Sequence, residues 1–503
     1  MHAYEKLAGP LGPRAAPARL RPGAVRFALA ATLAVAGHHW LWGDAAGLGL
    51  ALTLGVFGVA AILWDVGRRG GDAARIAGAS ALLILALVVV LEAATALSTP
   101  LALSLAGLSA LVAAGRGPRR AAEVPGRLAT LALAFVGRPS RDLFQRMRRR
   151  RARPGAPGLA RPGWLAPAAL TLAFLALFAE ANPIISAFGD DVSGWFLSAE
   201  APLRAACVAG LLCIAWTWLR PPKRRDGGSG FAFAEPAARA FFPGDAAIPS
   251  LIVFNALFAA QTGLDLWLLW GGGAPPEGMT YADYAHRGAY PLLGAALLAA
   301  AFILVAFRPG SAAERAPAAR RLAYLWILQI GMLVASSVLR LDLYVGAYGL
   351  TMLRAAAFVW MGLVAIGLAL IAVRLALRLS GAWLVGANLL SAFAVLYACC
   401  FVDFAAGVAR FNVEVAKAGG PPLDAYYAAR LGPAAIPALD DALAAGLVDP
   451  LDQPGVRRMR ERAAIAHRAA MEDWRAWDRR DLALLSYLDA QPAAPHTRTE
   501  AHP

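Results

Sequence analysis

The chain has 503 residues, of which 59% are hydrophobic and 16% are charged, and its mean hydropathy is +0.54. Soluble domains carry about a quarter charged residues, so this composition excludes a soluble globular protein and fits the lipid bilayer as solvent. The net charge of +15 does not indicate nucleic-acid binding, because the basic residues are concentrated in particular loops between apolar runs. We predict an all-α, polytopic transmembrane helix bundle.

Eleven apolar runs are candidates for helices that cross the bilayer. Backbone polar groups in hydrocarbon must be satisfied internally, so each span should be a helix of roughly 20 residues. The fourth run is the weakest prediction, because its apolar core from Leu101 to Ala114 is short. The predicted spans are 24–42, 45–64, 73–97, 99–115, 164–181, 203–219, 250–270, 289–307, 322–340, 349–373 and 382–403.

The distribution of basic residues predicts the orientation of these spans. Of the 48 Lys and Arg residues, 32 fall in or beside loops that the count places in the cytoplasm, and only Arg204, Arg287 and Arg340 fall in outer loops. Dropping the fourth span would move the later basic loops outside, so the positive-inside rule supports that span. The N-terminus is therefore predicted to be cytoplasmic, with a retained first helix. The odd span count places the C-terminus in the periplasm of a bacterial inner membrane.

Residues 121–163 are predicted to form a basic amphipathic segment on the cytoplasmic surface. Apolar residues recur there at helical spacing among many arginines, as in helices that lie in the membrane interface. Anionic lipid headgroups are the predicted partner, with each arginine contributing on the order of 1 kcal/mol. An RNA-binding or regulatory segment is the alternative. The arginines predicted to contact lipid are Arg127, Arg141, Arg146, Arg148, Arg149, Arg150 and Arg151.

The residues after the last span are predicted to form a small soluble helical tail. Amphipathic helices are expected from Leu423 to Leu443 and from Val456 to Leu488, with a Pro/Asp turn between them. A protein partner, if there is one, is expected to bind this tail. The predicted regions are 1–120 with four spans, the basic segment 121–163, 164–403 with seven spans, and the tail 404–503.

Ionisable residues gather near the predicted outer ends of the spans. Charges at membrane depth are costly, so this layer carries information. Polar residues gather wherever helix ends meet water, but a shared outward-facing cleft is the functional alternative. Arginines there can clamp a phosphate or carboxylate, or pair with nearby acids as structural ties. The candidate site residues are Glu180, Asn182, Asp265, Tyr281, Tyr284, His286, Arg287, Arg340, Asp342, Tyr344 and Arg354.

Standard catalytic motifs are absent from the sequence. It contains no Walker A loop, no HExxH and no GxSxG. His38 and His39 are neighbours separated by about 100° around a helix, which makes them a poor chelating pair. No metal or cofactor is predicted. The four cysteines lie in apolar runs and are predicted to be free thiols that act as small hydrophobes: Cys207, Cys213, Cys399 and Cys400.

Several blocks resemble a known family. They are FNALFAAQTGLDLWLLWGG, GMTYADYAHRGAYPLL, SSVLRLDLYVGAYGLTMLRAAAFVWMGLVAIGL and ARFNVEVAKAGGPPLDAYYAARLGPAAIPAL. Together these blocks, within roughly 165–445, are similar to an uncharacterised bacterial multi-pass inner-membrane family, a domain of unknown function of the 4153/4173 type. The resemblance implies an integral membrane protein. It assigns no catalytic residue.

Three functional hypotheses follow. The first is a transporter-like protein with an outward-facing vestibule for an anionic or zwitterionic solute, which predicts polar side chains at the bilayer midplane, with Asn255, Gln329 and Asn388 as candidates. The second is an enzyme acting on a lipid-linked or envelope substrate at the outer leaflet, which predicts a cavity lined by Asp265, Arg340 and Arg354. The third is a non-catalytic assembly or sensor protein. Transport is slightly favoured, because no nucleophile–base pair is legible.

Overall fold

The computed structural model describes residues 22–43, 47–151, 200–223, 247–267 and 311–491, together with short helical pieces between 294 and 307. Throughout these ranges the regular structure is helical, without strands, which confirms the predicted all-α class. The long helices that precede the tail are α1 (Pro22–Leu41), α2 (Leu48–Arg69), α3 (Ala73–Glu92), α4 (Ser98–Ala113), α5 (Val124–Arg151), α8 (Ala201–Leu219), α10 (Ala247–Asp265), α13 (Pro317–Tyr348), α14 (Met352–Leu377) and α15 (Gly381–Cys399).

Seven helices in the described part of the chain are long and apolar enough to cross a membrane: α2, α3, α8, α10, α13, α14 and α15. They correspond to the second, third, sixth, seventh, ninth, tenth and eleventh predicted spans. The first and fourth predicted spans form α1 and α4, with 20 and 16 residues. The fifth predicted span, 164–181, lies outside the described residues, and the eighth is described only in part.

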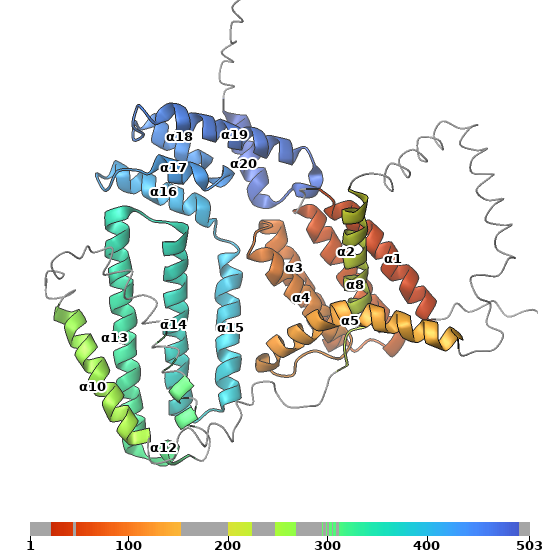
Figure 1. Cartoon of the computed structure of the whole chain (residues 1–503), viewed down its shortest axis with the longest axis horizontal. Helices are drawn as coiled ribbons and strands as arrows, with labels where there is room; N and C mark the ends of the chain where they lie inside the picture. The colour runs from red at the N-terminus through yellow and green to blue at the C-terminus, as the bar shows by residue number, and fades with distance from the viewer. Residues whose placement is uncertain are drawn as a thin grey trace, which may run out of the picture.

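The membrane helices form two groups, each around its own hydrophobic core (Figure 1). The first group contains α1 to α4 and α8, with Phe57 and Val89 fully buried among them. The second contains α10, α13, α14 and α15 around Trp326 and Ile330. Helix α15 lies between the groups and connects them, since the Tyr397 hydroxyl donates to the Leu85 carbonyl oxygen at 3.2 Å.

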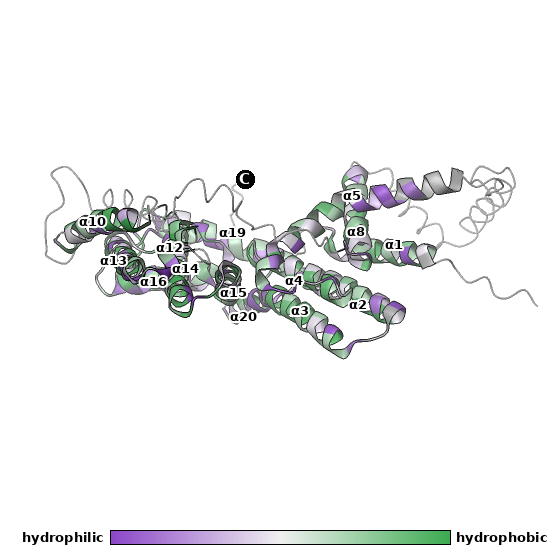
Figure 2. Cartoon of the chain, turned by 90° about the horizontal axis from the view of Figure 1, so that it is seen from below, coloured by the Kyte–Doolittle hydropathy of each residue, from purple (hydrophilic) through white to green (hydrophobic). Residues whose placement is uncertain are grey.

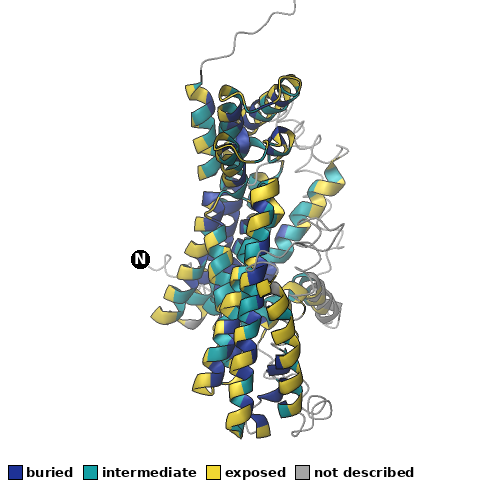
Figure 3. Ribbon diagram, turned by 90° about the vertical axis from the view of Figure 1, so that its left-hand side faces the viewer, coloured by how far each residue is buried: buried dark blue, intermediate teal, exposed yellow. Residues whose placement is uncertain are grey.

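Large hydrophobic side chains cover the outside of these helices. Leu353 is 84% exposed, and Leu328, Leu377 and Leu390 are each more than 60% exposed. Hydrophobic residues run along the helices of both groups in Figure 2, and many of the exposed positions in Figure 3 lie on the same long helices. Apolar surface of this extent is unfavourable in water. Lipid can surround this surface, because the backbone polar groups of the helices are hydrogen-bonded within each helix.

Helix α13 is longer than the predicted span of 322–340. It has 32 residues, about 48 Å at 1.5 Å per residue, against a hydrocarbon core of about 30 Å. Pro317 starts the helix, no further proline follows, and the helix ends before Gly349, which has a φ of 74°. The helix therefore continues for about two turns beyond Arg340, where the predicted span ends.

The described tail residues form one small helical domain above both groups (Figure 1). Each predicted amphipathic helix is interrupted, the first at Gly432-Pro433, where Gly432 has a φ of 90°, and the second between Asp473 and Asp478. One further helix starts directly after α15, where the Asp403 side chain accepts from the Ala406 amide. The tail helices are α16 (Phe404–Lys417), α17 (Ala425–Arg430), α18 (Ile436–Ala444), α19 (Gln453–Met471) and α20 (Arg479–Ala490).

Helix α5 crosses α8 near the end that points away from the tail (Figure 1). Trp216 of α8 and Arg220, the residue that follows α8, both donate to the Asp142 carboxylate of α5, at 3.1 and 2.5 Å. The predicted lipid contact of Arg127 is not supported, because its side chain is buried and donates to the Arg116 carbonyl oxygen. Arg141 is exposed. The side chains of Arg146 and of 148–151 lie outside the described part.

Candidate functional site

Most of the residues predicted to form an outer site lie outside the part of the chain that the structure describes. The side chain of Asp265, at the end of α10, is not described. Four candidates are described in full: Arg340, Asp342, Tyr344 and Arg354. Those that lie outside the described residues are Glu180, Asn182, Tyr281, Tyr284, His286 and Arg287.

Two of the four described candidates are in contact. The Arg354 guanidinium lies 4.1 Å from the centre of the Tyr344 ring. It also donates to the carbonyl oxygens of Tyr348 and Gly349, so it satisfies the last carbonyls of α13, which have no partner within the helix. Arg340 is buried on α13, whereas Asp342 is exposed. The Arg354 contacts are those of a structural tie between α13 and α14.

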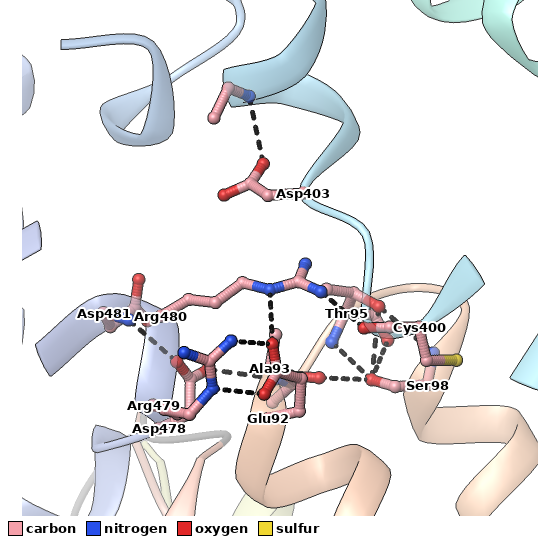
Figure 4. Close-up of polar contacts among 12 residues, drawn as sticks. Glu92, Ala93, Thr95, Ser98, Cys400, Asp403, Asp478, Arg479, Arg480 and Asp481 are labelled. Carbon is pink, nitrogen blue, oxygen red and sulfur yellow. Dashed lines mark hydrogen bonds and ion pairs between the residues drawn. The ribbon is translucent and has the colours of Figure 1, made fainter. Parts of the chain in front are cut away.

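A denser polar cluster lies where the tail meets α3 (Figure 4). Glu92, the last residue of α3, is only 7% exposed. Its carboxylate accepts hydrogen bonds from both Arg479 and Arg480, the first two residues of α20. Arg480 also donates to the Cys400 carbonyl oxygen at 2.5 Å. We call Glu92, Arg479 and Arg480 the clasp, because they fasten α20 to the ends of α3 and α15.

Asp478 reinforces the clasp from the preceding position. One of its carboxylate oxygens accepts from the Asp481 amide at 2.9 Å and caps α20, while the other accepts from the Ala94 amide at 3.0 Å, just after α3. Its side chain is 7% exposed. Burial raises the pKa of Asp478 above its usual value, although the backbone hydrogen bonds act in the opposite direction. The same carboxyl group thus starts a tail helix and holds the chain that follows a membrane helix.

The tail also binds the connection between α1 and α2. Arg475 donates to the His39 carbonyl oxygen at 2.7 Å, and the Leu48 amide donates to the Trp477 carbonyl oxygen at 2.8 Å. At Gly47, a Cβ atom would overlap the backbone carbonyl oxygens of Ala476 and Trp477. Glycine is therefore required here to let the tail backbone approach the start of α2.

Substitution of Gly47 by Ala should loosen this contact. The new methyl group meets backbone atoms that cannot rotate away, so we expect a destabilisation of about 1–3 kcal/mol, seen as faster hydrogen exchange in 472–478. Gly67→Ala, near the other end of α2, is the control, because nothing lies within 4 Å of its Cβ position. Equal effects of the two substitutions on exchange in 472–478 would contradict the close approach.

A third contact joins the tail to the turn between α13 and α14. The Asn412 side chain accepts from the Leu350 amide at 2.7 Å and donates to the Leu350 carbonyl oxygen at 2.8 Å. The Tyr427 hydroxyl accepts from the Met352 amide at 2.8 Å. The tail is thus bonded to both helix groups.

The polar residues expected at the membrane midplane are bonded to helix backbones. The Asn255 side-chain amide donates to the carbonyl oxygens of Leu251 and Leu322. The Gln329 side-chain amide donates to the Asn255 backbone carbonyl oxygen. The Asn388 side-chain amide donates to the Leu384 carbonyl oxygen. The side-chain oxygens of Asn255 and Gln329 are buried and accept no hydrogen bond from the described residues. Two of these side chains link α10 to α13, as polar residues commonly do between membrane helices, and the transport hypothesis gains no support from them.

The sequence matches a domain of unknown function, DUF4153, over residues 79–442, which is 364 of the 503 residues. The chain belongs to the DUF4153 family. This match begins in α3 and so extends further toward the N-terminus than the blocks that resemble the family. Glu92 lies inside the DUF4153 region, while Arg479 and Arg480 follow it. No curated protein and no solved structure matches the chain.

The DUF4153 chain is thus a protein with several membrane-spanning helices. Its four cysteines are all free, and Cys400 is buried near the clasp. Among the described residues, no group of three or more His, Cys, Asp or Glu side chains is arranged to hold a metal ion. The hydrogen bonds of Asp478, Arg479 and Arg480 attach the tail to the ends of α3 and α15.

Proposed function

We propose that this DUF4153 protein has a non-catalytic assembly role, in which the tail contacts a partner protein and the membrane helices hold the tail at the membrane surface. The clasp is the observation that carries the proposal. Glu92 is a buried carboxylate at the end of a membrane helix, and both arginines that it binds belong to the tail. The negative charge of Glu92 at the end of α3 therefore serves to attach the tail domain.

The three contacts of the tail support the same role. They join it to the ends of α1 and α2, to the ends of α3 and α15, and to the turn between α13 and α14. A domain held at several points presents its free surface in a fixed orientation. Such preorganisation lowers the entropic cost of binding a partner.

The free surface of the tail combines arginines with apolar side chains. Leu451 is 89% exposed in the turn before α19, and Ile465 is 61% exposed on α19. Arg457, Arg458 and Arg462 are exposed on the same helix. Arginine is enriched in protein interfaces, and a basic face is complementary to an acidic one. The partner that fits is a protein with an acidic surface.

Photo-crosslinking in cells tests this proposal. A photoreactive amino acid is placed at Leu451 or Ile465, and at Leu390 of α15 as a control, since that side chain is exposed on a membrane helix. The proposal predicts a discrete protein adduct from the two tail positions and none from Leu390.

The clasp variants make the test specific. In the double variant Arg479→Gln/Arg480→Gln, the adduct should decrease several-fold, because the tail is no longer held in one orientation. The double variant Arg410→Gln/Arg430→Gln removes the same charge from exposed positions of the tail and should leave the adduct unchanged. The absence of an adduct from both tail positions, or equal effects of the two double variants, would overturn the proposed role.

A further inference from the structure

A basic cavity lies in the first helix group, at the end away from the tail. Its volume is about 310 Å³. It is formed where α1 begins, α2 ends, α4 is followed by a turn and α8 ends. Among the described residues, its lining contains the basic Arg26, Arg68, Arg116, Arg220 and Lys223 together with the acidic Asp65.

An aromatic ring positions two of these arginines. The guanidinium of Arg26 lies 5.1 Å and that of Arg68 lies 5.8 Å from the centre of the Trp64 ring. Cations at this distance from an indole are attracted to its face. Trp64 itself lines the cavity. The two guanidinium groups are therefore held at the cavity wall before any ligand binds.

The turn after α4 and the segment after α8 are joined at the cavity. Arg116 donates to the Pro221 carbonyl oxygen. Arg138 of α5 donates to the Arg220 carbonyl oxygen at 2.6 Å. These bonds bring together cations that are far apart in the sequence.

Acidic residues balance only part of this charge. Asp142 binds Arg220 at 2.5 Å from outside the cavity lining. When Asp142 and Arg138 are counted with the lining residues, the described part of the chain places six basic and two acidic residues here. Burial, and to a smaller extent the neighbouring charge of Arg220, lower the pKa of Arg138, against the opposing effect of Asp142.

We infer that this cavity binds a phosphate group carrying more than one negative charge, either a lipid phosphomonoester headgroup or a small soluble phosphate compound. Guanidinium groups match phosphate oxygens with pairs of parallel hydrogen bonds. A single carboxylate would offset only one unit of the excess positive charge. The volume is at the lower end of the range for small-ligand sites, which suits a headgroup or a diphosphate. This inference is independent of the role proposed for the tail.

Binding to purified full-length protein tests the inference in two arms. The first measures inorganic pyrophosphate by calorimetry on protein in an uncharged detergent. The second measures phosphatidic acid by native mass spectrometry of protein released from phosphatidylcholine nanodiscs that contain it. Binding in the first arm alone identifies a soluble phosphate, binding in the second alone identifies a lipid headgroup, and binding in either supports the site.

The variant Arg68→Gln/Lys223→Gln removes two exposed cations from the cavity. It should weaken binding about tenfold or more, because hydrogen bonds between charged groups are the strong ones in a phosphate site. The matched control is Arg119→Gln/Arg120→Gln, which removes the same charge from exposed positions outside the cavity lining and should bind as the wild type does. The single variants Arg68→Gln and Lys223→Gln should each lose part of the affinity, which provides a second measurement if the double variant does not fold. No binding in either arm, or equal losses in the two double variants, would overturn the inference.

Discussion

Substitution of Glu92 by Gln should release α20 from the end of α3, with a roughly thirtyfold rise in the equilibrium constant for local opening of α20, or about 2 kcal/mol. The Glu92 side chain is 7% exposed and binds two arginines. The amide that replaces it has no charge, so both guanidinium groups lose their counter-charge while they stay near the interface. Hydrogen–deuterium exchange of the protein in nanodiscs measures this opening.

The two clasp arginines should contribute unequally. The Arg480 side chain is 17% exposed and also donates to the Cys400 carbonyl oxygen, whereas the Arg479 side chain is 68% exposed. Ion pairs that face water contribute little, so Arg480→Gln should increase exchange more than Arg479→Gln. The control is Arg410→Gln, an exposed position of α16. A larger effect for Arg479 would contradict the assignment of Arg480 as the main anchor.

Substitution of Asp440 by Asn should destabilise the tail domain itself by about 3 kcal/mol. Asp440 accepts two hydrogen bonds from Arg460, both at 2.8 Å, and one each from Tyr487 and Gln491. It thereby joins α18, α19 and the end of α20 through one carboxylate that is mostly buried. The melting temperature of the tail transition measures the loss. Asp449→Asn is the control, because Asp449 is exposed and its side chain bonds only to a local amide among the described contacts.

The same carboxylate predicts a pH dependence. Burial raises the pKa of Asp440, but the hydrogen bonds from Arg460, Gln491 and Tyr487 lower it by more, so the folded-state pKa lies below the usual value. Its stabilising contribution is therefore fully present above the unfolded-state pKa of about 3.9 and is lost as the pH falls through the folded-state value. The wild-type tail should lose this part of its stability under acid, and Asp440→Asn should not. Parallel melting curves for the two proteins across that pH range would contradict this role.

The membrane helices could be predicted from the sequence because hydropathy is a local property. A long apolar run in the bilayer has to form a helix, because only there are its backbone polar groups hydrogen-bonded within the segment itself. Helix ends were predicted less well, because α13 continues to Tyr348 after its apolar run stops. The breaks within the tail depend on local details, such as Gly432-Pro433 and the Asp478 cap, that a helical periodicity does not reveal.

The clasp and the basic cavity could not be predicted, because each depends on residues that are far apart in the sequence. Glu92 and Arg479 are separated by 387 positions, and neither was among the predicted site residues. The cations of the cavity come from four separate elements, and each one alone is explained by the positive-inside rule. Trp64 was not singled out, since an aromatic residue near a helix end is common at membrane interfaces.

A double-mutant cycle between Glu92 and Arg480 tests the attachment of the tail most directly. Hydrogen exchange of α20 is measured for the wild type, Glu92→Gln, Arg480→Gln and the double variant. If the clasp holds the tail, the effect of the double variant should be smaller than the sum of the single effects by at least about 1 kcal/mol, as expected for residues in contact. Additive effects would mean that Glu92 and Arg480 do not interact, and that the tail is not fastened to α3 through them.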